Sequence, residues 1–219
     1  MGDVKWIKPI KAVGFDVDGT LYHSPPELQM AVGGKIVAEA ARLLAQDPDE
    51  LAEEYLKRRE QYRSNTMTLN SFGLPGEEIF QKIWNEIPLE QYIQKDLKLV
   101  KLMEKLGREY QLFIISNGRM VEIKKKLEYI GLEADLFEPL IACYDQGWIK
   151  PEPSPFLLAI ESLKLQPEEI VYVGDRSDLD VEGAQATGMR TILIGGPSAG
   201  SGCLADECCE TTCDIMSVL

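Results

Sequence analysis

The sequence contains a single histidine, His23, among its 219 residues. A metal site with two histidine ligands is therefore excluded, and a catalytic triad or a cysteine–histidine pair would have to use His23. That residue lies in the segment HSPPE, whose serine and prolines are typical of a polar loop. Chemistry in this chain is therefore expected from carboxylates, lysine and a metal ion held by oxygen.

Basic residues are in the minority, with 23 Lys and Arg against 36 Asp and Glu and a formal net charge of −13. Such a charge repels nucleic acid and anionic membranes, so neither is expected as a partner. No run approaches the ~18 consecutive apolar residues of a membrane helix, and no secretory signal is recognisable. The sequence predicts a cytoplasmic protein, monomeric or homodimeric, and any anionic substrate needs local cations.

Four of the five cysteines crowd the end of the sequence, at Cys203, Cys208, Cys209 and Cys213. Their spacing differs from the paired Cys-x₂-Cys of a zinc site, and adjacent cysteines bridge each other poorly. A metal or redox function is therefore disfavoured, and we expect these residues to act as small apolar filler.

Five short runs rich in Val, Ile and Leu predict buried parallel strands, because they are apolar without clean alternation. They cover residues 11–18, 111–116, 140–145, 170–175 and 191–195. Helical segments separate the last four runs; one is expected to end at Gly131 and another to begin with Ser154 as its N-cap. This alternation predicts an α/β fold, a doubly wound, mainly parallel, five-stranded Rossmann-like core.

The first and second predicted strands are separated by far more chain than a crossover needs. Most of that segment has helical periodicity and helix-capping residues. We therefore expect a helical insertion at residues 22–94 and a core formed by residues 1–21 and 95–219.

Polar residues follow four of the five predicted strands, where ligands bind in open α/β sheets. Asp16 and Asp18 are two residues apart in a strand-like run, so their side chains point the same way. Each cluster alone has an explanation as a turn or a helix cap, and Asp178 is expected to be such a cap. Together they indicate an active site formed by Asp16, Asp18, Thr20, Ser116, Asn117, Lys150, Asp175 and Asp180.

The segments DVDGT, SNG and GDRSDLD, with the lysine before Pro151, resemble the four motifs of the haloacid dehalogenase (HAD) superfamily. The resemblance spans the α/β core. It also implies that the insertion after the first motif is a small helical cap of the C1 type, found in phosphoglycolate phosphatases and many nucleotidases.

The resemblance implies a Mg²⁺-dependent phosphomonoester hydrolase that acts on a small phosphorylated metabolite through an aspartyl-phosphate. Asp16 would be the nucleophile, and Asp18 would protonate the leaving group and then activate water. The Mg²⁺ ligands would be a carboxylate oxygen of Asp16, the backbone carbonyl of Asp18 and a carboxylate oxygen of Asp175, with Asp180 in the outer shell.

The phosphoryl group is expected to contact Lys150, Ser116, Asn117 and Thr20. An aspartate at position 18 argues against carbon–halogen cleavage, because a halide leaves without an acid. A phosphomutase of the β-phosphoglucomutase type uses the same aspartate pair and stays as the alternative.

Overall fold

The computed structural model describes residues 8–62, 64–195 and 203–219. The chain divides into two compact units: a core unit, Met1–His23 with Ile93–Leu219, and a helical unit, Ser24–Tyr92. Among the described residues, no helix has the length and apolar character needed to cross a membrane.

The core unit contains a parallel sheet with the strand order β3-β2-β1-β4-β5-β6. Its strands are β1 (Ala12–Phe15), β2 (Gln111–Ser116), β3 (Leu140–Ala142), β4 (Ile170–Gly174), β5 (Arg190–Ile194) and β6 (Glu207–Cys209). The α/β class is as predicted, but the described chain has six strands rather than five. Because the chain adds β2 and β3 on one side of β1 and β4 on the other, the strand order reverses between β1 and β4, where ligands bind in such sheets.

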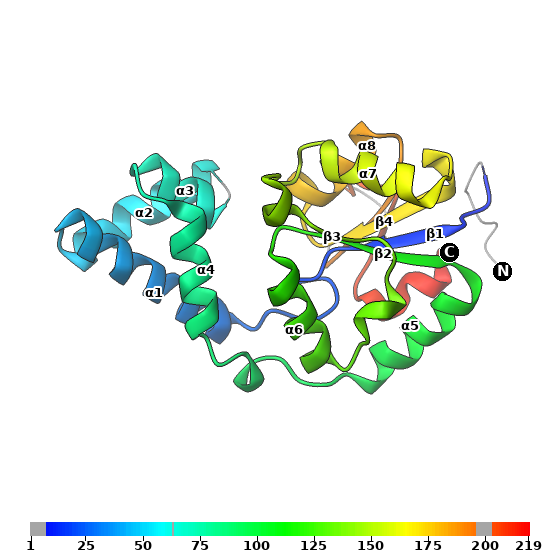
Figure 1. Cartoon of the computed structure of the whole chain (residues 1–219), viewed down its shortest axis with the longest axis horizontal. Coiled ribbons are helices and arrows are strands. Elements are labelled where there is room, and N and C mark those ends of the chain that lie inside the picture. The colour runs from blue at the N-terminus through cyan, green and yellow to red at the C-terminus, as the bar shows by residue number, and fades with distance from the viewer. Residues whose placement is uncertain (1–7, 63, 196–202) are drawn as a thin grey trace. The chain divides into compact units, whose positions relative to one another are not determined.

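Helices cover both faces of this sheet (Figure 1). One face carries α7 (Ser154–Leu163) and α8 (Glu182–Ala186), and the other carries α5 (Leu97–Glu109) and α6 (Met120–Ile130). Alternate strand residues such as Phe113 and Tyr172 pack with Phe156 of α7 in the buried core, where the rings of Phe156 and Tyr172 meet edge to face at 5.2 Å. The apolar strands are thus covered on both sides, as their sequence predicted.

The helix ends follow local sequence signals in most places. Gly131 ends α6 with a φ of 90°, as predicted, and Asp96 caps α5 by accepting hydrogen bonds from two backbone amides. The prediction for α7 was wrong by one residue: its N-cap is Pro153, and Ser154 is the first helical residue.

Two strands end earlier than their sequences suggested. Strand β1 stops at Phe15 and the following residues turn, with Gly19 at a φ of 84°. Strand β3 stops at Ala142, and the chain continues as a 3-10 helix over Cys143–Gln146. These early ends place the polar motif residues in the turns beyond the sheet.

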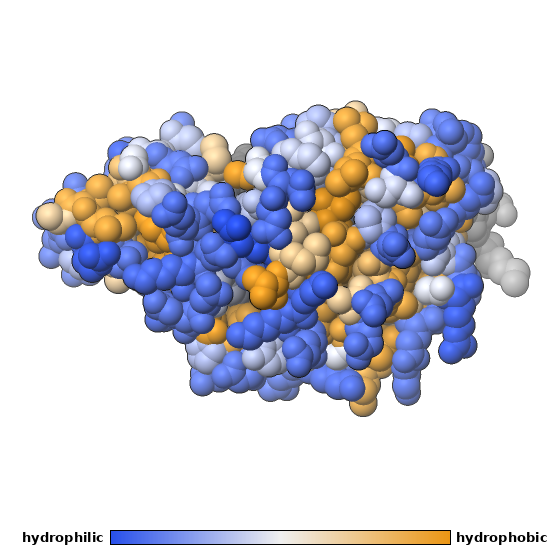
Figure 2. All heavy atoms as spheres, viewed as in Figure 1, coloured by the Kyte–Doolittle hydropathy of each residue, from blue (hydrophilic) through white to orange (hydrophobic). Residues whose placement is uncertain are grey.

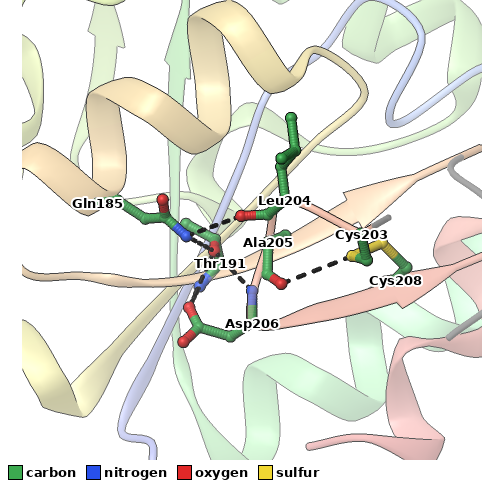
Figure 3. Close-up of a disulfide and its surroundings, with 7 residues drawn as sticks. All are labelled: Gln185, Thr191, Cys203, Leu204, Ala205, Asp206 and Cys208. Carbon is green, nitrogen blue, oxygen red and sulfur yellow. Dashed lines mark hydrogen bonds between the residues drawn. A yellow bond between two sulfur atoms is a disulfide. The ribbon is translucent and has the colours of Figure 1, made fainter. Parts of the chain in front are cut away.

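The cysteine-rich tail forms the sixth strand, which the sequence analysis missed. Strand β6 pairs with β5 and places Cys208 opposite Leu193, and the carboxylate of Asp206 accepts hydrogen bonds from the backbone and hydroxyl of Thr191 (Figure 3). Cys208 also forms a disulfide with Cys203. The expectation of apolar filler was therefore wrong for this pair, which links the strand covalently to the segment before it. A 3-10 helix, Thr212–Ser217, follows.

The helical unit contains α1 (Pro26–Leu44), α2 (Pro48–Tyr62), α3 (Asn65–Ser71), α4 (Gly76–Glu86) and a short 3-10 helix, Leu89–Gln91. Its helices carry buried apolar residues such as Leu28, Ile36 and Leu69. The guanidinium of Arg58 lies 3.9 Å from the ring centre of Phe72. Figure 2 shows many hydrophilic residues on the visible face of each unit, interspersed with hydrophobic areas.

Candidate active site

Asp16 and Asp175 follow the two adjacent strands at which the strand order reverses. Asp16 directly follows β1, and its backbone amide donates a hydrogen bond of 2.9 Å to the carbonyl of Val173 in β4. Asp175 directly follows β4. The parallel register therefore brings these two carboxylates to the same edge of the sheet.

Asp16, Asp175 and Asp180 form an acidic cluster. One carboxylate oxygen from each lies within 4.8 Å of the others. The Oδ1 atom of Asp175 is buried and has no hydrogen-bond partner among the described residues. An oxygen so placed fits a bound cation, since buried polar atoms are otherwise paired. Gly19 is required beside this cluster, because a Cβ there would lie 2.2 Å from Oδ2 of Asp175.

Lys150 is the cation at the centre of the acidic cluster. Its side chain is 1% exposed, and its Nζ lies 2.9 Å from Asp16 Oδ1 and 2.7 Å from Asp180 Oδ1. The same Nζ donates to the hydroxyl of Tyr172 and to the carbonyl of Ile115, each at 3.2 Å. Lys150 is thus held rigidly between two carboxylates, in an interior where charge interactions are strong.

The acidic cluster contains more carboxylates than lysines, and the pKa values of two of these carboxyl groups are raised. Burial raises the pKa of Asp16 to about 6, with Lys150 lowering it and Asp180 raising it. Burial raises the pKa of Asp175 to about 7, and the charges of Asp16 and Asp180 add to the shift. Burial lowers the pKa of Lys150, but Asp16 and Asp180 outweigh burial and hold it well above its usual range. A divalent cation would favour the ionised carboxylates.

Asp18 lies in a different environment from Asp16. Its carboxylate accepts hydrogen bonds from Lys126 Nζ, at 2.7 Å to Oδ1 and 2.6 Å to Oδ2, and Oδ1 also accepts from the hydroxyl of Tyr22. The sequence analysis missed both partners. Lys126 lies in the run KKK at residues 124–126, which looks like a solvated surface. Its position three residues after Ile123 was the available signal, because that spacing places both on one helix face.

The predicted phosphate-binding residues surround the same edge of the sheet. Ser116 is the last residue of β2 and is buried. The side chain of Asn117 accepts a hydrogen bond of 2.9 Å from the backbone amide of Lys150 and so fixes the turn that carries this lysine. Thr20 is buried, and its hydroxyl has no hydrogen-bond partner in the described part of the chain.

The role predicted for Asp178 was wrong. Its carboxylate binds the guanidinium of Arg176 at 2.8 Å, and the N-cap of the following turn is Arg176, with no side-chain hydrogen bond to that turn. Asp180 fixes the turn instead, by accepting a hydrogen bond of 3.0 Å from the amide of Arg176. Asp178 therefore forms a partly buried ion pair with Arg176 in place of the predicted helix cap.

These groups can support nucleophilic substitution at an electrophilic centre that carries negative charge. Asp16 is a buried carboxylate, Lys150 offers a fixed positive charge, and Asp18 is a second carboxylate, whose side chain is 35% exposed. A carboxylate beside a second carboxylate and a fixed cation is an arrangement that can support covalent catalysis with acid–base assistance, as in hydrolases and group-transfer enzymes.

Comparisons with known proteins identify the family of this chain. The model of the haloacid dehalogenase-like hydrolases matches residues 10–188, and the chain belongs to that family. It is 29% identical over 204 residues to a glyceraldehyde 3-phosphate phosphatase of Methanopyrus kandleri, with 84% of each chain covered. It is 27% identical over 185 residues to a phosphoglycolate phosphatase of Aquifex aeolicus, again with 84% of each covered.

The fold also matches solved structures. The crystal structure of a HAD phosphatase from Thermococcus onnurineus aligns with a TM-score of 0.69 at 28% identity and covers 95% of this chain and 97% of that one. The superfamily expected from the four motifs is thereby confirmed.

Proposed function

We propose that this protein is a phosphomonoester hydrolase that uses Mg²⁺ and acts on a small phosphorylated metabolite. The observation that carries the proposal is the acidic cluster: three carboxylates share a single buried lysine, and one oxygen of Asp175 has no partner in the described chain. Such a site combines a nucleophile with an excess of negative charge that a divalent cation offsets.

In the first step Asp16 attacks the phosphorus and forms an aspartyl-phosphate, and the alcohol departs with a proton from Asp18. In the second step Asp18 takes a proton from water, which attacks the aspartyl-phosphate and releases inorganic phosphate. Lys150 offsets charge on the phosphoryl oxygens, and the Ser116 hydroxyl and the Asn117 backbone amide donate hydrogen bonds to them. The hydroxyl of Thr20, which has no hydrogen-bond partner among the described residues, is available for the same purpose.

The residues present fit a magnesium ion. Asp16 and Asp175 would hold it with the backbone carbonyl of Asp18, and Asp180 would support Lys150 from the outer shell. Bound Mg²⁺ would offset the charge of the nucleophile and of the phosphoryl oxygens. The Asp175 oxygen that has no partner in the described chain, and the negative charges that raise the pKa of this carboxyl, favour a cation at this position.

Relatives named as phosphatases favour hydrolysis over the phosphomutase alternative. Their names also suggest the substrate class, a short phosphorylated aldehyde or acid such as glyceraldehyde 3-phosphate or phosphoglycolate. We retain the predictions of a cytoplasmic location and of a monomer or homodimer with no nucleic-acid or membrane partner.

The test is a panel of phosphate esters, including p-nitrophenyl phosphate and both named metabolites, assayed with and without Mg²⁺. Wild-type protein should release phosphate only with the metal, and Asp16→Asn should lower kcat by at least about a thousandfold while the protein stays folded. Asp135→Asn is the matched control. Asp135 is exposed and lies before the start of β3, whereas the acidic cluster lies beyond the ends of the strands. A wild-type protein that hydrolyses no ester would contradict the proposal.

A further inference from the structure

The carboxylate of Asp18 is held by three hydrogen bonds that come from outside the acidic cluster. Lys126 Nζ binds both carboxylate oxygens, and the hydroxyl of Tyr22 binds Oδ1. Both partners belong to the core unit, and Tyr22 lies two residues before the chain enters the helical unit. We call Lys126 and Tyr22 the Asp18 clamp.

Packing alone does not explain a lysine at this position. The buried face of α6 is otherwise apolar, with Ile123, Leu127 and Ile130, and Lys126 is only 4% exposed. Burying an ammonium group costs more free energy than burying an apolar side chain of similar size, even when the charge is paired. An apolar side chain would complete this face at lower cost, so the lysine is better explained by what it binds.

The clamp also distinguishes the two oxygens of the carboxylate. A carboxylate oxygen has about two acceptor sites. In the described chain Oδ1 accepts from Lys126 and Tyr22, whereas Oδ2 accepts from Lys126 alone. A tyrosine hydroxyl ordinarily titrates at about pH 10, so the phenol is a donor at neutral pH. Oδ2 therefore keeps the acceptor site that a transferable proton needs.

We propose that Lys126 and Tyr22 are positioning residues that fix the Asp18 carboxylate so that Oδ2 exchanges the proton with the leaving oxygen. The inference rests on the proposed function. When the ester bond breaks, its electron pair stays on the leaving oxygen and the phosphoryl group passes to Asp16. The O–H bond at Asp18 breaks, and a new O–H bond forms on the departing alcohol.

The leaving group provides a readout that a structural role would not move. An alkyl ester such as glycerol 1-phosphate needs its leaving oxygen protonated, whereas p-nitrophenolate is stable enough to depart without an acid. The value of kcat/KM reports the steps up to the departure of the alcohol. A lost clamp should therefore lower kcat/KM for the alkyl ester selectively, while general loss of fold or of phosphate binding lowers both values together.

The experiment compares kcat/KM for the two esters, with Mg²⁺, in wild-type protein and in Lys126→Met, whose side chain is unbranched and neutral. The variant should lose about thirtyfold or more with glycerol 1-phosphate and about threefold or less with p-nitrophenyl phosphate. Lys126→Arg, which keeps the charge and two donors, should restore part of the loss. The control Lys124→Met removes the same charge from an exposed position of α6 and should change neither value.

Tyr22→Phe removes only the hydroxyl and should show the same selectivity with a smaller loss, of about threefold to tenfold with the alkyl ester. If Lys126→Met does not fold, Tyr22→Phe tests the positioning of Asp18 in its place. Equal losses with both esters, or an unchanged or higher rate with glycerol 1-phosphate, overturn the inference and leave the phosphatase proposal standing. Wild-type protein that hydrolyses neither ester overturns both.

Discussion

The core unit contains two buried lysines whose surroundings differ in charge balance. Lys150 lies among three carboxylates and binds two of them, Asp16 and Asp180. Lys126 binds both oxygens of the Asp18 carboxylate. The first environment keeps an excess of negative charge, whereas the second contains an ion pair between one ammonium group and one carboxylate.

This difference separates two tasks that one pair of neighbouring aspartates must perform. A nucleophile that works beside a divalent cation needs uncompensated negative charge around it, which the acidic cluster supplies. A group that exchanges protons with the substrate needs a fixed orientation, which the ion pair with Lys126 supplies. Under the proposed function, Lys150 thus serves a metal-binding site and Lys126, which is similarly buried, serves an oriented carboxylate.

The largest expected effect comes from removing the lysine of the acidic cluster. Lys150→Met removes the ammonium group that binds Asp16 and Asp180, and with it the positive charge that would face the phosphoryl oxygens. We expect kcat/KM to fall by at least about a thousandfold with both p-nitrophenyl phosphate and glycerol 1-phosphate. A loss confined to the alkyl ester, as expected for Lys126→Met, would erase the distinction between the two lysines. Steady-state kinetics on the two variants side by side measure this.

The second-largest expected difference between the two lysine regions is in their response to Mg²⁺. Asp175→Asn removes one carboxylate whose oxygen has no partner in the described chain, and it should abolish the rise in Tm that Mg²⁺ produces in wild-type protein. Activity should fall by about a hundredfold or more. Lys126→Met should keep the wild-type Tm response to Mg²⁺. Thermal melts across a Mg²⁺ titration test this, and an undiminished response in Asp175→Asn would place the metal elsewhere.

The acidic cluster should also make the stability of metal-free protein depend on pH. Folding raises the pKa of Asp16 to about 6 and that of Asp175 to about 7, so the folded state binds these protons more tightly than the unfolded state. Their contribution to stability is present below the unfolded pKa near 4 and is lost as the pH rises through 6 and 7. The Tm in EDTA should therefore include a decrease between pH 5 and pH 8 that Asp175→Asn weakens. Equal pH profiles for the two proteins would contradict this charge assignment.

The smallest expected effect is that of the disulfide, which lies in neither lysine region. The bond between Cys203 and Cys208 closes a short loop beside β6, and β4 and β5 separate that strand from β1. For so short a loop the stabilisation is at most about 2 kcal/mol. Reduction with dithiothreitol, or the change Cys203→Ser, should lower Tm by at most about 8 °C and leave kcat/KM unchanged. A large loss of activity would connect the tail to catalysis.

The sequence was sufficient for those parts of the fold whose signals are local. Apolar runs marked β1, β2, β4 and β5, and Gly131 marked the end of α6. Strand β6 escaped because its sequence, Glu-Cys-Cys, is only three residues long and lacks the branched residues that mark strands. Its place in the sheet depends on pairing with β5, which is a tertiary contact.

The candidate site divides in the same way. The four motifs predicted the residues that lie around Lys150 in the structure. This was possible because parallel strands place their carboxyl ends at one edge of the sheet, whatever segments connect them. The partners of Asp18 could not be read from the motifs. Lys126 comes from a helix that follows another strand, and only the fold decides which of three consecutive lysines faces the core.

Phosphorylation of Asp16 can be detected by trapping the intermediate. In Asp18→Asn, p-nitrophenyl phosphate should still phosphorylate the protein, because its leaving group needs no acid, while water is no longer activated to remove the phosphoryl group. Acid quenching, proteolysis and mass spectrometry should then find one phosphoryl group on the peptide that contains Asp16. A phosphoryl group on another residue, or p-nitrophenol release from Asp18→Asn with no phosphopeptide, would contradict the account.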